Sequence, residues 1–488
     1  MKNVLKKCAA MIVLSIVSVF LLVAEETPIE NLYEYTLDNG LSVFVAENHS
    51  APLVYIEIAV RAGAIAQTPE NAGLFHLYEH MMFKGNPKYK NSQAMQRALN
   101  DMGCSNWNGT TSDNRVNYFI TVPVDQFENG LEFWSYAVRE PLMNPKELED
   151  EKKVVMSEIQ GYFGKPSWQS EYYLQKTLCP EAPWTLDACG PVENIQNATV
   201  VQLKEIQKKY YIPNNAALFI GGDVKPDEAI ELVKKVYGNW EKGADPWATD
   251  KNQYAENPLS EPQYAVVPMD EMSPQIAQIV VSYHGPDADY NLQDTYTADA
   301  MLQVLSDPTG AFKTTVLKNK ALQIPNAEYL GASYKTTRRF GKMSFTGVVL
   351  NPADNLTDRV KSFYETLTTK ALPAVQNDKS LESEKKRKIL LQTINDSRAW
   401  EAETAESLLS VLSYFWCYAS KDYYMTYSDN LKKIQKADVD ALIENYVYNR
   451  NPLIMVYVNP AVYEQTKDAF DKAGYVTVSA DNAFWWGK

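Results

Sequence analysis

The sequence of 488 residues contains only four histidines and five cysteines. A chain of this length is not a small domain held together by disulfides, and the absence of any C-x-x-C pair leaves a cysteine zinc site without support. Basic residues are also in the minority, because 47 Lys and Arg stand against 61 Asp and Glu. The formal charge of -14 therefore argues against a surface that binds nucleic acid. After the first 24 residues, no segment is long and apolar enough to cross a bilayer.

The amino terminus is typical of an export signal. Three lysines precede an apolar run that extends from Ala9 to about Ala24, so residues 1–24 are expected to direct export. This places the protein in the bacterial periplasm or on the extracytoplasmic face of the membrane. An uncleaved anchor is the alternative, and only then would the chain contact a membrane. In an exported chain, Cys179 and Cys189 bracket a short loop and are the plausible pair for a disulfide bridge.

Strand and helix patterns alternate along the rest of the chain and predict an α+β fold of layered domains. We expect a catalytic, metal-binding domain over residues 25–240, a linker over 241–262 and a second, homologous domain without a metal motif over 263–488. The repeat rests on KYYIPNNAALFI, starting at Lys209, and NYVYNRNPLIMV, starting at Asn445. Each reads as a helix end, a turn with asparagine and an apolar strand; coincidence is the alternative to duplication.

The first half contains the clearest individual elements. Alternating residues predict two strands within 33–47 around an Asp-Asn-Gly turn, and further strands at 53–60, 117–122 and 217–221. Apolar periodicity and capping residues predict helices at 73–83, 92–102, 127–138, 145–162, 200–210 and 226–237.

Two of the four histidines lie in the segment GLFHLYEHMMFKG as His76 and His80. On a helix, residues four apart share a face, so both imidazoles can reach one ion, with Glu79 on the flank of that face. This H-x-x-E-H spacing is that of inverted zincins. A third ligand is needed, and Glu151 and Glu158 lie two helical turns apart in EKKVVMSE. We favour Glu158 as the ligand and Glu151 as a supporting carboxylate, although spacing alone does not rank them.

Each of these segments, taken alone, could instead be a solvated helix face. The combination of two helices with complementary ligand types in one domain of an exported protein favours a metal site. No such motif occurs in residues 263–488, so we expect one zinc ion per chain.

The chain resembles the insulinase/pitrilysin-type inverted zinc metallopeptidases, in particular their shorter processing-peptidase-like members. The resemblance is carried by GLFHLYEHMMFKG, NGTTSDNRVNY, NPKELEDEKKVVMSEI and GPVENIQNATVVQLKEIQKKYYIPNNAALFIGGDV. It implies that His76, His80 and Glu158 bind zinc, that Glu79 is the general base and that Glu151 is the supporting carboxylate.

The resemblance also implies that peptides bind in extended form along an edge strand, with Asn108 and Thr111 in contact with substrate. Such proteins are clamshells of four homologous domains, so this chain would form half of a chamber. The family's Arg and Tyr pair from the facing half is missing here, because Lys318 and Pro325 stand near the expected positions. Tyr329 could take the place of the family's Tyr only if the loop around it had a different conformation. We therefore expect a homologous second subunit to supply the pair, with a homodimer as the alternative.

The leading interpretation is an exported zinc endopeptidase, the metal-bearing subunit of a two-chain enzyme. A non-catalytic scaffold or core subunit of the same fold is the main alternative, and intact ligand and base positions argue against it. A metal-dependent hydrolase acting on other substrates is the third.

Overall fold

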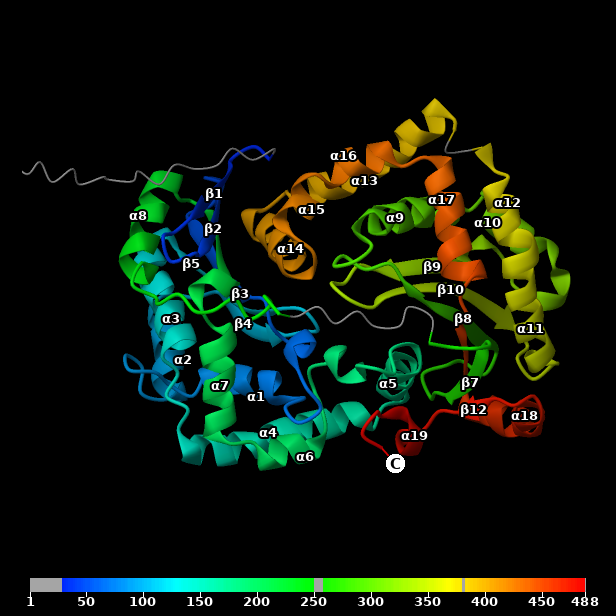
Figure 1. Cartoon of the computed structure of the whole chain (residues 1–488), viewed down its shortest axis with the longest axis horizontal. Helices are drawn as coiled ribbons and strands as arrows, with labels where there is room; N and C mark the ends of the chain where they lie inside the picture. Colours follow the sequence, from blue (N-terminus) through cyan, green and yellow to red (C-terminus); the bar gives the residue numbers. More distant parts are fainter. Residues whose placement is uncertain (1–28, 250–257, 380–381, 488) are drawn as a thin grey trace, which may run out of the picture.

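The computed structural model of the chain describes residues 29–249, 258–379 and 382–487. The predicted export signal, residues 1–24, lies outside the described residues, as does the central part of the predicted linker. Figure 1 shows two halves side by side, here called the first half (residues 29–249) and the second half (residues 258–487). In these segments, every helix is too short or too polar to span a bilayer.

Each half is built around one six-stranded sheet. In the first half the strand order is β1-β2-β6-β3-β5-β4, and only β2 and β6 pair in parallel. The strands are β1 (Leu32–Thr36), β2 (Ser42–Glu47), β3 (Leu53–Val60), β4 (Asn106–Thr111), β5 (Val116–Pro123) and β6 (Ala216–Gly222). The helices are α1 (Leu74–Met82), α2 (Ser92–Asp101), α3 (Phe127–Arg139), α4 (Pro145–Phe163), α5 (Pro166–Leu178), α6 (Val192–Asn197), α7 (Val200–Tyr210) and α8 (Pro226–Tyr237).

The second sheet has the order β12-β7-β11-β8-β10-β9, and its strands from β7 to β9 repeat the pairing directions of β2 to β4, with β7 and β11 in parallel. The edge strand differs, because β12 pairs with β7 in parallel whereas β1 pairs with β2 in the antiparallel direction. Its strands are β7 (Gln263–Pro268), β8 (Ile276–Gly285), β9 (Leu330–Lys335), β10 (Gly341–Leu350), β11 (Leu453–Val458) and β12 (Val476–Thr477). Strands β6 and β11, which end the two repeated segments of the sequence, occupy the same place in the two sheets. The α+β fold with a duplicated architecture is confirmed.

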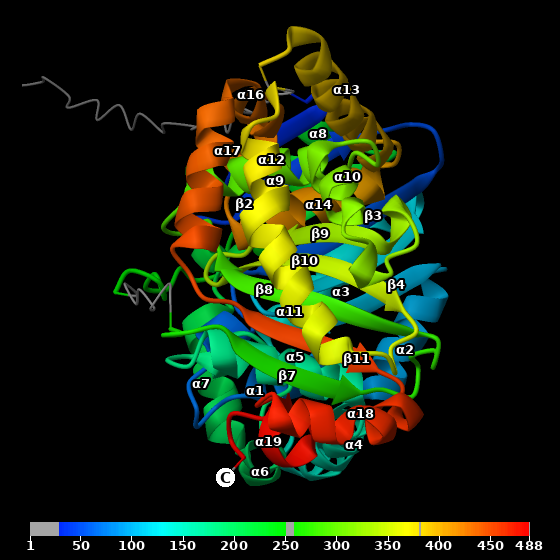
Figure 2. The ribbon, with the colours of Figure 1, turned by 90° about the vertical axis from the view of Figure 1, so that its right-hand side faces the viewer.

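Helices α11, α12 and α17 lie in front of the second sheet in Figure 2. The helices of this half are α9 (Leu292–Ser306), α10 (Ala311–Lys318), α11 (Leu356–Thr366), α12 (Leu372–Gln376), α13 (Glu384–Glu401), α14 (Ala405–Tyr418), α15 (Lys421–Met425), α16 (Tyr427–Lys433), α17 (Lys436–Ile443), α18 (Pro460–Lys472) and α19 (Ala480–Ala483).

Most elements predicted for the first half end within two residues of their expected bounds. Helix α4 begins where its sequence indicates, because the Asn144 side chain accepts a hydrogen bond from the backbone N–H of Lys146 at 2.8 Å and proline follows the cap. The patterns did not indicate β4, α5 or α6. Strand β4 is rich in polar residues and largely exposed, so it has no alternation of apolar and polar positions to detect.

The two halves exchange helices, in the sense that one helix of each half packs on the sheet of the other half. Helix α14 of the second half packs on β2, β3 and β6, and α5 of the first half packs on β7 and β11. Figure 1 places α14 between the halves. The fit is close at Gly221, where an added Cβ would lie 2.6 Å from Leu409 Cδ1 and 2.8 Å from Ala405 Cβ. Each sheet is therefore covered on one face partly by a helix of the other half. The division into domains over residues 25–240 and 263–488, with a linker between them, stays a prediction.

The two cysteines expected to pair are free thiols in the structure. Cys179 packs into an apolar cluster with Leu178, Ala265 and Met455, whereas Cys189 belongs to the main core of the first half. Because the two thiols are buried in different clusters, the short loop between them does not bring them together.

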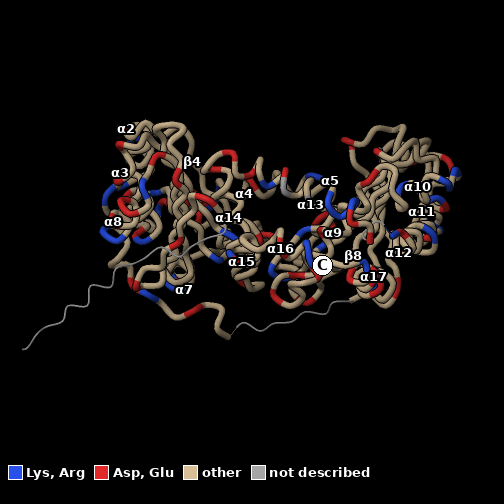
Figure 3. The backbone as a smooth tube through the Cα atoms, turned by 90° about the horizontal axis from the view of Figure 1, so that it is seen from above, with Lys and Arg blue, Asp and Glu red and all other residues tan. Residues whose placement is uncertain are grey.

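Acidic and basic residues are interspersed along both halves (Figure 3). This is the mixed surface expected for a chain in which acidic residues are in moderate excess.

Candidate metal centre

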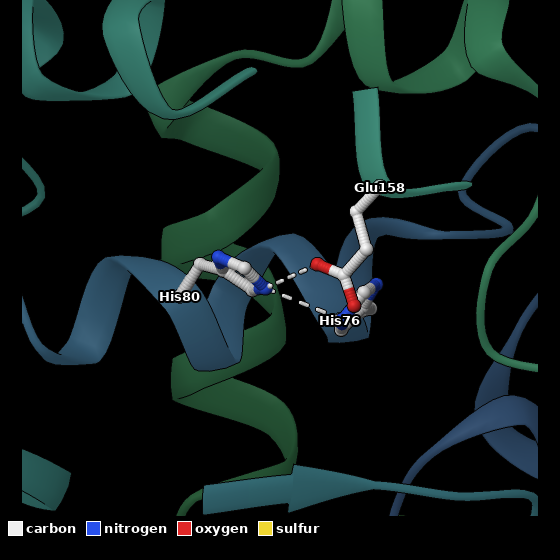
Figure 4. Close-up of side chains that lie close together, drawn as sticks. All are labelled: His76, His80 and Glu158. Carbon is white, nitrogen blue, oxygen red and sulfur yellow. Dashed lines mark hydrogen bonds and ion pairs between the residues drawn. The ribbon is translucent and has the colours of Figure 1, made fainter. Parts of the chain in front are cut away.

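The candidate centre lies where α1 packs against α4. His76 and His80 are one turn apart on α1, and their Nε2 atoms are 3.3 Å from each other. Figure 4 shows Glu158, which comes from α4, pointing toward both imidazoles. Its Oε2 lies 3.5 Å from His80 Nε2. The structure thus brings together the three residues that the sequence predicts as ligands.

The donor atoms of this group fit a zinc ion. One atom from each of His76, His80 and Glu158 can be chosen so that all three lie within 4.8 Å of one another. Ligands bound tetrahedrally at the usual zinc distances are separated by about 3.3 Å, close to the two spacings found here. Two imidazoles and one carboxylate also leave a fourth position for water, as catalytic zinc sites require.

Glu151 lies behind His80, on the side away from the ligand atoms. Its Oε1 is 2.8 Å from His80 Nδ1, and its Oε2 forms an ion pair with Lys84. Because an ionised carboxylate can only accept, Nδ1 of His80 carries the proton of this bond, so in the neutral imidazole Nε2 has the lone pair that a metal would use. The geometry supports Glu151 as the supporting carboxylate and Glu158 as the ligand.

Glu79 lies on the strand side of α1. Its Oε2 accepts a hydrogen bond from Thr111 Oγ1 at 2.7 Å, so the last residue of β4 contacts the predicted base. Asn108 is three residues earlier on the same strand, where its Oδ1 accepts a hydrogen bond from the N–H of Gly109 at 3.0 Å. A cavity lies beside this centre, and Asn108 is not among the residues that line it.

Burial and neighbouring charges set the protonation of these groups. Burial and the neighbouring His80 lower the pKa of His76 to about 4, which leaves a neutral imidazole. Burial disfavours charge on His80 as well, but its hydrogen bond to Glu151 and the surrounding carboxylates raise its pKa overall. Burial raises the pKa of Glu79, partly offset by the hydrogen bond from Thr111.

A cavity of about 580 Å³ opens beside the candidate ligands His76 and Glu158. It is lined by residues of both halves, among them His76, Thr111, Glu158, Tyr162, Trp168 and Lys335. Lys335, at the end of β9, is 2.7 Å from Asp113 Oδ2 in the turn that follows β4. The cavity is large enough to accommodate several side chains of a peptide.

Sequence reasoning missed three of the residues around this centre. Lys84 and Tyr162 each lie four residues after a predicted site residue, so helical spacing could have pointed to both. Tyr162 donates its hydroxyl to Glu158 Oε1 at 2.8 Å, and this bond raises the pKa of the phenol to about 12. Lys335 comes from the other half of the chain, and no local signal connects it to the centre.

Two family models match the chain. The model described as "Insulinase (Peptidase family M16)" matches residues 42–183, and the model described as "Peptidase M16 inactive domain" matches residues 197–377. The first range contains all seven residues that the sequence predicts for the site: His76, Glu79, His80, Asn108, Thr111, Glu151 and Glu158.

Several named proteins are similar in sequence. A probable mitochondrial-processing peptidase subunit beta of Arabidopsis thaliana is 26% identical over 250 residues, which are 51% of this chain and 46% of that protein. A protein of Bacillus subtilis described as "Uncharacterized zinc protease YmfH" is 28% identical over 221 residues, which are 43% of this chain and 50% of the relative. The zinc protease PqqE of Helicobacter pylori is 26% identical over 202 residues, 41% and 45% of the two chains. The chain thus spans about half the length of these relatives.

Solved structures share the fold at low sequence identity. A protease from Helicobacter pylori superposes with a TM-score of 0.70 at 17% identity, covering 90% of this chain and 100% of that one. The first half of the periplasmic protease PqqL from Escherichia coli gives 0.71 at 16% identity, with 91% and 95% coverage. The complete PqqL chain is matched over 52% of its length.

Proposed function

Because this chain belongs to the insulinase family of peptidases, M16, we propose that it is a zinc-dependent endopeptidase that hydrolyses peptides bound in extended form. The observation that supports this most directly is the convergence of His76 Nε2, His80 Nε2 and a Glu158 oxygen beside Glu79. These three residues would hold the ion. When bound, zinc lowers the pKa of its water toward neutrality and polarises the carbonyl of a substrate.

Glu79 is the proposed general base. Its burial raises the pKa of the carboxyl, which makes the carboxylate a stronger acceptor for the proton of the attacking water. The same group would then donate that proton to the leaving amine. Thr111 donates a hydrogen bond to this carboxylate from the strand side and so restricts its orientation.

Strand β4 is the proposed peptide-binding edge. It is the outermost strand of the first sheet and pairs only with β5 among the described residues. Its outer backbone groups can accept an extended peptide by strand addition, which reads main chain more than side chain. Thr111 connects this edge to the base, and Asn108 is proposed to contact substrate further along the same strand.

We also propose export and pairing with a second chain. The composition of residues 1–24 supports export, as does the description of the similar Escherichia coli protein as periplasmic. This chain matches about half of that protein, and another relative is named as a subunit. A homologous second subunit would supply the Arg and Tyr for which this chain has Lys318 and Pro325; a second copy of this chain is the alternative partner.

A peptide-cleavage assay tests this proposal. Protein lacking residues 1–24 is incubated with a panel of quenched fluorogenic peptides, alone and with homologous subunits that lack the H-x-x-E-H motif. We expect cleavage that requires zinc and that is lost in Glu79→Gln. Stoichiometric zinc without cleavage under any of these conditions would instead favour the non-catalytic scaffold, and cleavage of esters but not peptides would favour a hydrolase of another class.

A further inference from the structure

The carboxylate of Glu158 has a different neighbour at each oxygen. Oε2 lies 3.5 Å from His80 Nε2, whereas Oε1 accepts a hydrogen bond from the hydroxyl of Tyr162 at 2.8 Å. Tyr162 follows Glu158 by four residues on α4, so both side chains leave the helix on the same face. A phenol keeps its proton at neutral pH and therefore acts as the donor in this bond.

The ring of Tyr162 is held in turn by Trp168 of α5. The two rings are stacked, with centroids 4.6 Å apart and planes inclined by 11°. A tyrosine ring has two rotatable side-chain angles, and stacking on a second ring restricts both. The phenol is thereby directed toward Glu158 and is not free to rotate into solvent.

The second half of the chain anchors the helix that carries Trp168. Helix α5 packs on β7 and β11, and Lys342 of β10 donates to Glu171 Oε1 at 2.8 Å. Tyr172, one turn after Trp168, contacts the carboxyl-terminal rings of Phe484 and Trp486 with centroids 5.1 and 5.3 Å away. The position of Trp168 thus depends on contacts made by the opposite half.

We propose that Tyr162, braced by Trp168, is a positioning residue for the metal ligand Glu158. By occupying Oε1, the hydroxyl leaves Oε2, the oxygen 3.5 Å from His80 Nε2, as the single ligand oxygen. This fixes the orientation of a side chain that otherwise has three rotatable angles, and hydrogen bonds to ligating side chains commonly tune metal affinity in this way. The inference rests on the proposed function, because it takes Glu158 to be a ligand.

A direct contact between Tyr162 and substrate is the competing explanation, since Tyr162 lines the cavity together with Thr111. The two roles have different consequences. Loss of a positioning hydroxyl weakens zinc binding in the absence of any peptide, whereas loss of a substrate contact raises KM and leaves zinc binding unchanged.

The test compares Tyr162→Phe and Trp168→Leu with the parent and with Tyr463→Phe. Tyr463 is the matched control, because its hydroxyl bonds Thr477 Oγ1 at 2.8 Å in the second half. Zinc affinity is measured by competition with a chromogenic chelator, and the cobalt-substituted proteins are compared by visible absorption. We expect zinc affinity to fall about tenfold or more in Tyr162→Phe, and by less in Trp168→Leu. The cobalt spectrum should change in Tyr162→Phe and stay unchanged in Tyr463→Phe.

The outcomes distinguish this inference from the proposed function. If the parent binds one zinc and Tyr162→Phe has the same affinity and cobalt spectrum, the positioning role is overturned and the metal site stands. A raised KM with unchanged zinc affinity would overturn it too, in favour of substrate contact. A folded parent that binds no zinc would overturn both.

Discussion

Thr111 Oγ1 donates a hydrogen bond to Glu79 Oε2 at 2.7 Å and so joins the exposed edge of the first sheet to the predicted general base. The two residues are 32 positions apart in the sequence, and only the packing of α1 against β4 brings them together. A peptide added to β4 would therefore lie beside Glu79, the proposed general base.

This contact predicts the effect of changing Thr111. Thr111→Val keeps the shape of the side chain but removes the donor, and a hydrogen bond to a charged group is worth about 1.5–3 kcal/mol. We expect kcat/KM for a fluorogenic peptide to fall about tenfold or more. Thr111→Ser retains the hydroxyl and should stay near the parent; equal activity of the two variants would show that the bond has no catalytic importance.

Glu151→Gln should weaken zinc binding although Glu151 is not a ligand. The carboxylate accepts from His80 Nδ1 at 2.8 Å and pairs with Lys84, and an amide would fix the imidazole less firmly. Loss of such a partner typically weakens metal affinity by about 10–100-fold. Chelator competition measures the effect, and Glu149→Gln, an exposed change on the same helix, is the control. Unchanged affinity in Glu151→Gln would contradict the supporting role.

Two glycine substitutions are expected to change the free energy of unfolding in opposite directions, one where α14 packs on the first sheet and one on α4. At Gly221 a new methyl group would meet Leu409 and Ala405 of α14, so Gly221→Ala should destabilise the protein by about 1–3 kcal/mol. At Gly161 on α4, an added Cβ would meet no described atom within 4 Å beyond the glycine itself, its chain neighbours and the backbone of its own helix, and alanine should stabilise the helix by about 0.5–1 kcal/mol. Thermal unfolding of both variants checks this; a neutral Gly221→Ala would mean that α14 packs loosely.

Asp299 predicts a pH-dependent contribution to stability. Tyr427 donates its hydroxyl to Asp299 Oδ2 at 2.8 Å, and burial raises the pKa of this carboxyl from 3.8 to about 6. The ionisable groups that face it include Tyr334 and Tyr423, both of which have raised pKa values and stay neutral.

The sign follows from proton binding. Between pH 3.8 and about 6 the native carboxyl holds its proton more tightly than the unfolded one, so its contribution to stability falls as pH rises, and above pH 6 the full penalty is present. Asp299→Asn removes the ionisation and should gain on the order of 2 kcal/mol relative to the parent at pH 7.5 but little at pH 4. A difference in Tm that does not vary with pH would refute this.

The amino-acid sequence predicts the local parts of this structure best. The spacing of His76 and His80 requires only a helix, and the capped start of α4 places Glu158 on a neighbouring one. These are properties of single elements with strong patterns. The resemblance to a known family then assigned Glu79 and Glu151, which spacing left without a definite role.

The remaining features depend on contacts between distant segments. Strand β4 is polar and exposed, so its pattern does not distinguish it from a turn, and its link to Glu79 arises through Thr111. Helices α5 and α14 each pack on the sheet of the other half, and no local pattern indicates a contact between segments so far apart in the sequence. Lys335, at the end of β9, likewise reaches the cavity from the second half.

The zinc content of the purified protein tests the central claim most directly. Protein lacking residues 1–24 is analysed for bound metal together with Glu79→Gln, Glu158→Gln and the control Glu149→Gln. If His76, His80 and Glu158 bind zinc, we expect one zinc per chain in the parent, in Glu79→Gln and in the control. Binding should be lost or strongly weakened in Glu158→Gln. A well-folded parent that contains no zinc, even after the ion is added, would contradict the account and leave the scaffold as the better explanation.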